Sequence, residues 1–409
     1  MVRIAVLSDF HFGNARSLDM CMPNKGKPID KDYFAQFISF LEEKKFDIDY
    51  LICSGDISDT ADLDEFFLAE NCINKILDIF NIDIGKFFFS VGNHDKDWSI
   101  PIPENASKKN IDFRMNQMYQ PIQYDDHIFG KRINDGSKSQ TNNPYFQIIE
   151  DEKVVVISYN SSFQDSKEES QHHGMITREN LLHLEEELKK FDIENDKIKI
   201  FVTHHQLLQF PSPDPEDEID FSLMQNSGEL LCLLSKYKID LVVHGHTHAP
   251  NIQPAAIGTP FPVLLIGAGS FSYKLPTSWG SSVSNQFHII EIDKRSDSTN
   301  FLLGKVLSWA YISRLGWVPS ERTCGIEHIY PFGYYPLDQE LNELIKPIMI
   351  REKNKGKIAI SLKELIEEAK LEHVSLASII MILERLKSKY GFTIRGKEMD
   401  IEDLILYGN

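Results

Sequence analysis

The chain has 409 residues, of which 42% are hydrophobic, which allows a globular protein of two or three domains. Its formal net charge of −18 argues against nucleic-acid binding by the surface as a whole, and no apolar run reaches the roughly 20 residues that span a bilayer. Five scattered cysteines without a CxxC pair, and a first strand with no signal-peptide pattern before it, lead us to expect a cytoplasmic protein that does not bind membranes.

The negative charge is unevenly distributed. From Glu340 onward 12 Lys and Arg balance 12 Asp and Glu, so the whole excess lies in the first 339 residues. A nucleic acid would therefore have to be held locally, by metal ions or by the C-terminal segment.

Apolar strands and amphipathic helices alternate at the start of the chain. Strands are predicted at residues 2–8, 49–53 and 86–91, with helices at 30–41 and 62–79 between them. Strands separated by helices are typical of crossover connections, so we expect a largely parallel sheet.

After a loose insertion at 96–143, which we expect to cover a site, the alternation resumes. We predict strands at 144–149, 153–159, 198–203 and 239–244, and helices at 177–190 and 226–237. Further strands at 262–268, 286–292 and 301–307 lack helices between them and would form an antiparallel portion on or beside the first sheet. The predicted fold class is α/β, with a two-sheet core flanked by helices (αββα).

The last hundred residues have a different character. Residues 311–339 are rich in aromatic residues, Gly and Pro without any period, which favours a connecting arm. Helices at 341–350, 361–370 and 375–390, with a short strand at 392–395, predict a small helical domain at 340–409, either three-helix or winged-helix. This domain could bind a protein partner or mediate self-association.

Metal-ligand residue types follow the ends of five predicted strands. Because side chains at strand ends gather at one edge of an α/β sheet, we expect these groups to meet. We interpret Asp56 as a carboxylate shared by two metal ions. The five segments are Asp9-x-His11, Gly55-Asp56-x-x-Asp59, Gly92-Asn93-His94-Asp95, His204-His205 and Gly245-His246-x-His248.

These segments, in this order and at this spacing, resemble the motifs of the calcineurin-like metallophosphoesterase superfamily over residues 1 to about 310. Two flanking runs, His173-Gly174 and Gly267-Ala268-Gly269-Ser270, are similar to small cyclic-nucleotide and glycerophosphodiester phosphodiesterases. The run Asp9-x-His11-x-Gly13 is also similar to SbcD-type DNA-repair nucleases, which usually carry Phe where Ser58 stands.

The resemblance implies two divalent metal ions, with Mn, Fe or Zn all compatible and Mn favoured. A water bridging ions about 3.5–4 Å apart would attack phosphorus in line. His94 would bind the phosphate or protonate the leaving oxygen, because its side chain would face away from that of Asn93. One ion would be held by Asp9, His11, Asp56 and His248, and the other by Asp56, Asn93, His204 and His246.

Four further residues have two interpretations each. Asp59 either caps the helix at 62–79 or orients a ligand. Asp95 either forms a turn or pairs with His94. His205 is an alternative to His204 as the ligand of its pair, although the family pattern favours His204. Asn160 ends a strand at the same edge, where it would either contact substrate or have no role in the site.

Three classes of function remain open from sequence. The first is a metal-dependent phosphodiesterase acting on a nucleotide, a cyclic nucleotide or a nucleic acid, the last including a nuclease within a DNA-repair or defence assembly. The second is a phosphomonoesterase or phosphoprotein phosphatase, which would share every ligand. The third is an inactive scaffold, which missing ligands would favour, and none is missing here.

Overall fold

The structure, a computed structural model, describes residues 1–13, 17–19, 30, 32–100, 114–134, 145–165, 173–190, 196–210, 223–279, 282–355, 359–390, 392–395 and 405–408. Two compact units divide the chain. The larger contains Val2–Ile289 and Ser308–Ile326. The smaller contains Met1, Ile290–Leu307 and Glu327–Asn409.

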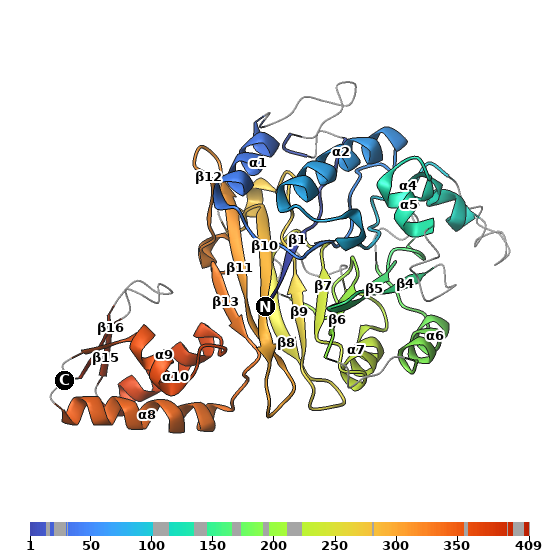
Figure 1. The fold of residues 1–409 in the computed structure, drawn as a ribbon. Coiled ribbons are helices and arrows are strands. Elements are labelled where there is room, and N and C mark those ends of the chain that lie inside the picture. The colour runs from blue at the N-terminus through green and yellow to red at the C-terminus, as the bar shows by residue number, and fades with distance from the viewer. Residues whose placement is uncertain are drawn as a thin grey trace. The chain divides into compact units, whose positions relative to one another are not determined.

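The first sheet begins with three parallel strands, β1 (Val2–Leu7), β2 (Tyr50–Cys53) and β3 (Phe87–Phe89). Its full order is β12-β11-β10-β1-β2-β3, with β13 also paired to β11 (Figure 1). The later strands are β10 (Gln286–Arg295), β11 (Leu302–Ile312), β12 (Gly316–Pro319) and β13 (Ile329–Phe332). Helices α1 (Tyr33–Lys44) and α2 (Leu63–Phe80) connect the first three strands and make the crossovers that parallel pairing requires.

The second sheet has the order β4-β5-β6-β7-β9-β8. Its strands are β4 (Phe146–Glu150), β5 (Val154–Tyr159), β6 (Ile198–Val202), β7 (Leu241–His244), β8 (Asn251–Ala255) and β9 (Val263–Gly267). Leucines of α6 (Arg178–Leu188) and α7 (Ser227–Lys236) share one hydrophobic core with strand residues such as Ile157, Phe201 and Leu265. These helices therefore cover the second sheet, and the two-sheet αββα prediction is confirmed.

Several details differ from the predictions. Strand β9 pairs in parallel with β7 in the second sheet, whereas we expected it in an antiparallel portion at the first sheet. Strand β8 and the helices α4 (Gln120–Gln123) and α5 (Ile128–Asn134) were not predicted, and β12 and β13 lie inside the expected connecting arm 311–339. Much of the insertion 96–143, at 101–113 and 135–143, lies outside the described residues. Short 3-10 helices occur at Ile84–Lys86, Thr277–Trp279 and Arg322–Cys324.

The C-terminal part of the smaller unit contains three helices and a small antiparallel sheet of order β14-β16-β15. The chain order of helix, strand, helix, helix, strand, strand is that of a winged helix. Side chains such as Ile345, Leu365 and Ile379 form its aliphatic core. The elements are α8 (Asp338–Asn354), β14 (Ala359–Ser361), α9 (Leu362–Ala369), α10 (Leu376–Tyr390), β15 (Phe392–Arg395) and β16 (Ile405–Gly408).

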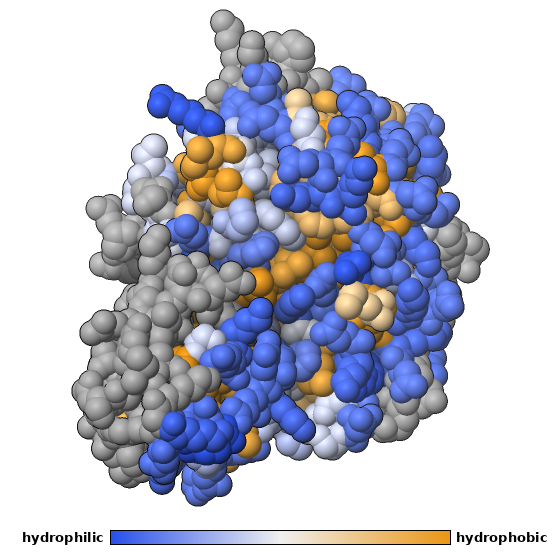
Figure 2. All heavy atoms as spheres, turned by 60° about the vertical axis from the view of Figure 1, so that its left-hand side comes forward, coloured by the Kyte–Doolittle hydropathy of each residue, from blue (hydrophilic) through white to orange (hydrophobic). Residues whose placement is uncertain are grey.

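The outer surface is mainly hydrophilic on the face drawn in Figure 2, where hydrophobic residues form small groups among charged and polar ones. Among the described residues, the most exposed large hydrophobic side chains include Leu315 and Leu337, which are 72% and 77% exposed. No helix in the described ranges combines the length and hydrophobicity needed to cross a membrane.

Candidate metal centre

The loop after β1 and the loop after β2 run side by side and bring their acidic residues together. The backbone N–H of Asp9 donates to the carbonyl of Gly55 (3.1 Å), and that of His11 donates to the carbonyl of Asp56 (3.0 Å). The backbone N–H of His246, in the loop after β7, donates to Oδ1 of Asp9 (3.0 Å). These bonds join loops from both sheets at one edge, where strand-end residues were predicted to meet.

Backbone conformation at this edge is unusual, because five of the predicted ligand residues have positive φ. L-residues rarely adopt this region, and each instance costs of the order of 1–3 kcal/mol, so it persists only where the surrounding structure enforces it. The pairs Asp9/His11 and His246/His248 therefore do not converge through extended backbone, in which side chains two residues apart face the same side. The φ angles are 51° for Asp9, 50° for His11, 51° for Asp56, 71° for His246 and 58° for His248.

The first ligand set consists of Asp9, His11, Asp56 and His248, whose donor atoms all lie within 4.8 Å of one another. Nε2 of His11 is 3.2 Å from Nε2 of His248 and 3.6 Å from Oδ2 of Asp56. Nε2 of His248 is 3.4 Å from Oδ1 of Asp9. Oδ2 of Asp9 is buried and has no hydrogen-bond partner among the described residues. An unpaired buried carboxylate oxygen is costly unless a cation binds it, so these side chains fit a divalent metal ion.

The second ligand set consists of Asp56, Asn93, His204 and His246. Oδ2 of Asp56 is 3.2 Å from Nε2 of His204. Oδ1 of Asn93 lies 3.0 Å from both Nε2 of His204 and Nδ1 of His246. Nδ1 of His204 is 2.9 Å from the carbonyl of Ser54, which can only accept, so Nε2 of the neutral ring carries the lone pair. Lone pairs that converge at 3.0–3.2 Å fit a second cation, and Asp56 is common to both sets.

The charges of the cluster depend on one another. Burial would raise the pKa of Asp56, but the histidines around it, His204 first, hold it well below its usual value. Burial opposes a charge on His204, yet the carboxylate of Asp56 raises the pKa of His204 to about 9, so a metal ion bound to its Nε2 would displace the proton that the ring otherwise holds at neutral pH. Burial lowers the pKa of His11 to about 4, which keeps that ring neutral as a metal ligand must be. The cluster is thus a buried anionic site that attracts cations.

Asp59 contacts two histidines of the site. Its Oδ1 lies 3.4 Å from Nδ1 of His11 and 3.6 Å from Nδ1 of His94. The N-cap of α2 is Asp62, which forms a capping box with Glu65, so the structure does not support the capping role for Asp59. Orientation of a histidine by a carboxylate behind it is common at metal sites.

Two of the other three residues with two interpretations, Asp95 and His205, lie around the cluster. The carboxylate of Asp95 accepts the backbone N–H groups of Ser58 (2.8 Å) and Gly92 (2.9 Å), so it joins two loops instead of pairing with His94. Burial, and then the charge of Asp56, raise the pKa of Asp95 to about 7. Nδ1 of His205 is 2.9 Å from Oγ of Ser161, and its ring centroid is 4.3 Å from that of His246. His205 thus contacts His246, a residue of the second ligand set, and is itself held by Ser161.

Among the described residues, the Asn160 side chain interacts with its own turn and with Tyr119, and forms no hydrogen bond to a residue of either ligand set. Its Oδ1 accepts the backbone N–H of Ser162 at 3.1 Å, a local turn contact. Substrate contact by Asn160 therefore has no support from the geometry of the described residues.

Close backbone approach explains why glycine stands at position 92. A Cβ there would lie 2.1 Å from Oδ1 of Asp56 and 2.3 Å from its backbone nitrogen. The loop after β3 can therefore approach the shared carboxylate only without a side chain at this position. Gly55 has a φ of +106° and likewise supports the turn that delivers Asp56.

Sequence reasoning missed Tyr273, whose ring packs on two histidines of the first ligand set. The centroid distances are 4.1 Å to His248 and 4.7 Å to His11. Tyr273 is half-buried and follows the Gly267–Ser270 run by three residues. That run marked the region, but a lone tyrosine three positions later carries no signal of its own.

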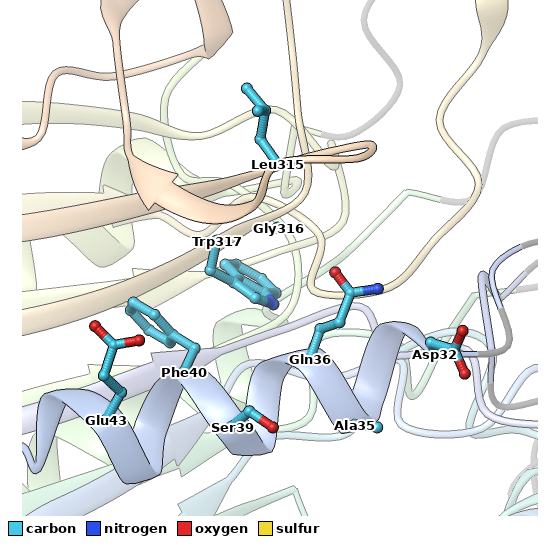
Figure 3. A pocket seen from close by; sticks show the side chains of 9 residues that line it. All are labelled: Asp32, Ala35, Gln36, Ser39, Phe40, Glu43, Leu315, Gly316 and Trp317. Carbon is cyan, nitrogen blue, oxygen red and sulfur yellow. The ribbon is translucent and has the colours of Figure 1, made fainter.

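A pocket of about 440 Å³ lies on a different part of the larger unit, between α1 and the turn that joins β11 to β12 (Figure 3). Phe40 and Trp317 provide its apolar side, and Asp32 and Glu43 lie toward its two ends. None of its lining residues belongs to the two ligand sets, so this surface is separate from the metal centre.

A sequence model described as calcineurin-like phosphoesterase matches residues 2–250. The chain belongs to the calcineurin-like phosphoesterase family. The match includes every residue of the two ligand sets, and the resemblance of the five motifs is confirmed at the level of the family. A dimetal centre is what this family and the ligand cluster together indicate.

This phosphoesterase is similar to a probable cyclic nucleotide phosphodiesterase of Xenorhabdus bovienii, with 23% identity over 208 residues. That alignment spans 50% of this chain and 63% of the relative. Among solved structures, it resembles a purple acid phosphatase of yellow lupin (Lupinus luteus), with 16% identity, 75% of this chain and 51% of that chain covered, and a TM-score of 0.48. It also resembles a dimetal phosphatase of Danio rerio, with 12% identity, 76% and 99% covered, and a TM-score of 0.43.

Proposed function

We propose that this protein is a dimetal phosphodiesterase that hydrolyses a small nucleotide-like phosphodiester. The observation that carries the proposal is the position of Oδ2 of Asp56, 3.6 Å from Nε2 of His11 and 3.2 Å from Nε2 of His204. One carboxylate oxygen between two histidine groups gives the site two adjacent cation positions. Divalent ions bound there would polarise the phosphoryl oxygens and supply a nucleophile from water at neutral pH.

The chain's own groups then determine which proton moves and where. Nδ1 of His94 is 2.8 Å from the carbonyl of Asp59, which can only accept, so Nδ1 carries a hydrogen. When the ring is protonated on both nitrogens, Nε2 of this partly exposed side chain carries the proton that would bind the phosphate and then pass to the leaving oxygen, which leaves the ring neutral with its hydrogen on Nδ1. The backbone N–H of His94 also donates to Oδ1 of Asp56 (2.8 Å), which ties the proton donor to the shared carboxylate.

The choice of a small diester rests on two observations. The relative from Xenorhabdus bovienii is described as a probable cyclic nucleotide phosphodiesterase. In the C-terminal part of the smaller unit, cations pair with neighbouring acids, as in Arg351–Glu368, Arg385–Asp338 and Lys387–Glu384. Cations already neutralised on their own surface gain less from phosphate contacts, which disfavours a nucleic acid as substrate. A phosphomonoester shares the ligand requirement and is the second candidate.

Other assignments stay predictions. We keep Mn as the favoured metal among Mn, Fe and Zn, because mixed nitrogen and oxygen donors suit all three. The cytoplasmic location and a docking or self-association role for residues 340–409 likewise stay predictions.

The test is a substrate panel with metal-free protein reloaded with Mn. The proposal predicts cleavage of bis(p-nitrophenyl) phosphate and a cyclic nucleotide, weaker cleavage of p-nitrophenyl phosphate, and little cleavage of single-stranded DNA. Asp56→Asn should lower the turnover of the diester by more than about a hundredfold, because even the loss of a group that only supports a metal ligand costs about 10–100-fold. Asp78→Asn, a change on the exposed face of α2, is the matched control and should leave turnover intact.

Two results would contradict the proposal. Asp56→Asn with wild-type turnover would remove the shared carboxylate from the mechanism. A preference for the monoester over every diester would move the protein to the phosphatase class.

A further inference from the structure

Trp98 is tied to the loop that carries Asn93. Its Nε1–H donates to the backbone carbonyl of Asn93 at 2.8 Å. At the other end of the same residue, Oδ1 of Asn93 lies 3.0 Å from Nε2 of His204 and 3.0 Å from Nδ1 of His246. The indole therefore holds the backbone of the residue whose side chain completes the second ligand set.

Lys96 holds the Trp98 ring in turn. Its side chain is fully buried, and Nζ lies 4.5 Å from the centroid of the Trp98 ring. The ammonium also donates to the backbone carbonyl of Asp165, in a segment that follows β5. A desolvated cation over an indole face contributes about 2 kcal/mol, so the ring has little freedom to turn. The support for Asn93 thus extends from its own loop to the second sheet.

Asn93 needs such support more than the other ligands do. Unlike the Asp56 carboxylate, its amide has no net charge that draws the oxygen toward a cation. His204 is oriented by the bond between its Nδ1 and the carbonyl of Ser54, whereas the terminal torsion of an Asn side chain is broad and weakly restrained. Residues 93–96 form turns and bends, and residues 91–96 include no helix or strand. The position of the Asn93 backbone therefore decides where its amide oxygen lies.

We propose that Trp98, held by Lys96, is a positioning residue for Asn93 and thereby sets the affinity of the metal position bounded by the second ligand set. The proposal rests on the dimetal centre of the proposed function. The position bounded by the first ligand set does not include Asn93. One ion should therefore depend on Trp98, and the other should not.

The experiment is calorimetric titration of metal-free, full-length protein with Mn²⁺. Trp98→Phe keeps an aromatic ring for Lys96 and removes the N–H. The wild type should bind two ions, and Trp98→Phe should bind one of them about tenfold more weakly while the other keeps its wild-type affinity. Equal affinities in variant and wild type, or an equal loss at both positions, would overturn the proposal.

A matched control exists in the same chain. Nε1 of Trp279 has no hydrogen-bond partner within the described ranges, so Trp279→Phe removes an indole N–H that supports nothing. This variant should bind both ions as the wild type does. If it weakens one ion as Trp98→Phe does, the effect is not specific to Asn93 and the proposal fails.

A second variant tests the contribution of Lys96 to the binding of the same ion. Lys96→Met keeps the buried stem and removes the ammonium, so it should weaken the same ion as Trp98→Phe. Combining the two changes should weaken that ion by less than the product of the single effects, because both act through one contact chain. Wild-type protein that binds fewer than two ions would instead contradict the dimetal centre itself, which separates that failure from a failure of the Trp98 proposal.

Discussion

The loops of the metal centre and the C-terminal residues from Glu327 onward differ in the kind of side chain that they bury. At the metal centre, acidic and imidazole side chains are buried or half-buried together, and five of these residues have positive φ. From Glu327 onward, every side chain that the structure describes as buried is hydrophobic. In that region α9 begins with a capping box formed by Ser361 and Glu364.

The comparison indicates that the metal centre, and not the C-terminal region, contains the energetically costly features. Buried charge and left-handed backbone each cost free energy, and they persist only where surrounding structure enforces them. The C-terminal region has no buried charge among its described residues, and its folding follows from ordinary apolar burial and capping. Changes in metal, pH or loop sterics should therefore affect the metal centre and leave the C-terminal region unchanged.

Gly92→Ala should have the largest effect. The added Cβ would lie 2.1 Å from Oδ1 of Asp56, so the shared carboxylate must move. We expect diester turnover to fall by at least about a hundredfold and the free energy of unfolding to fall by about 1–3 kcal/mol. The measurements are turnover with Mn and the shift in Tm on adding Mn, which the variant should lose.

Gly228→Ala is the control for that change. A Cβ at Gly228, in the first turn of α7, meets nothing within 4 Å. This substitution should raise the free energy of unfolding by about 0.4–1 kcal/mol and leave turnover unchanged. If Gly92→Ala has the turnover and stability of Gly228→Ala, then the close approach of the loop after β3 to Asp56 does not determine the geometry of the metal centre.

Acid should destabilise the larger unit through His288. Burial lowers the pKa of His288 to about 3, against 6.5 for an unperturbed histidine. Between these values the unfolded chain binds a proton that the folded chain does not. Stability contributed by neutral His288 is therefore complete above pH 6.5 and falls by about 1.4 kcal/mol for each unit below it, down to the folded pKa.

His288→Gln should reduce this slope, and urea unfolding of metal-free protein at a series of pH values measures it. The exposed His183→Gln is the control and should keep the wild-type slope. Equal slopes for His288→Gln and wild type would contradict this account of the buried histidine.

The parts of the fold that could be predicted are those with clear periodicity. Alternating strands and helices identified β1 to β3 and β5 to β7, because buried strands and amphipathic helices differ in period. Strands β12 and β13 were missed because Gly, Pro and aromatic residues obscure any alternation between 309 and 336. The parallel pairing of β9 with β7 was missed because the intervening chain forms β8 instead of a crossover helix.

The ligand candidates were accessible from sequence because residue type and strand-end position suffice to nominate them. The backbone conformation of these residues could not be predicted from sequence, since positive φ at Asp9 or His246 depends on contacts between loops distant in sequence. The position of Asp59 could have been anticipated, because Asp62 and Glu65 have the capping-box spacing. Tyr273 contacts the centre only through tertiary structure, whereas Trp98 contacts Asn93 within its own loop; no sequence motif marks either residue.

The most direct test of the central claim, that Asp56 is shared by two ions, is the Mn²⁺ content and affinity of wild type, Asp9→Asn and Asp56→Asn measured side by side. We expect two ions in the wild type, one weakened ion in Asp9→Asn, and both weakened in Asp56→Asn, because Asp9 belongs to one ligand set and Asp56 to both. An Asp56→Asn protein that loses a single ion and keeps the other at wild-type affinity would contradict that claim.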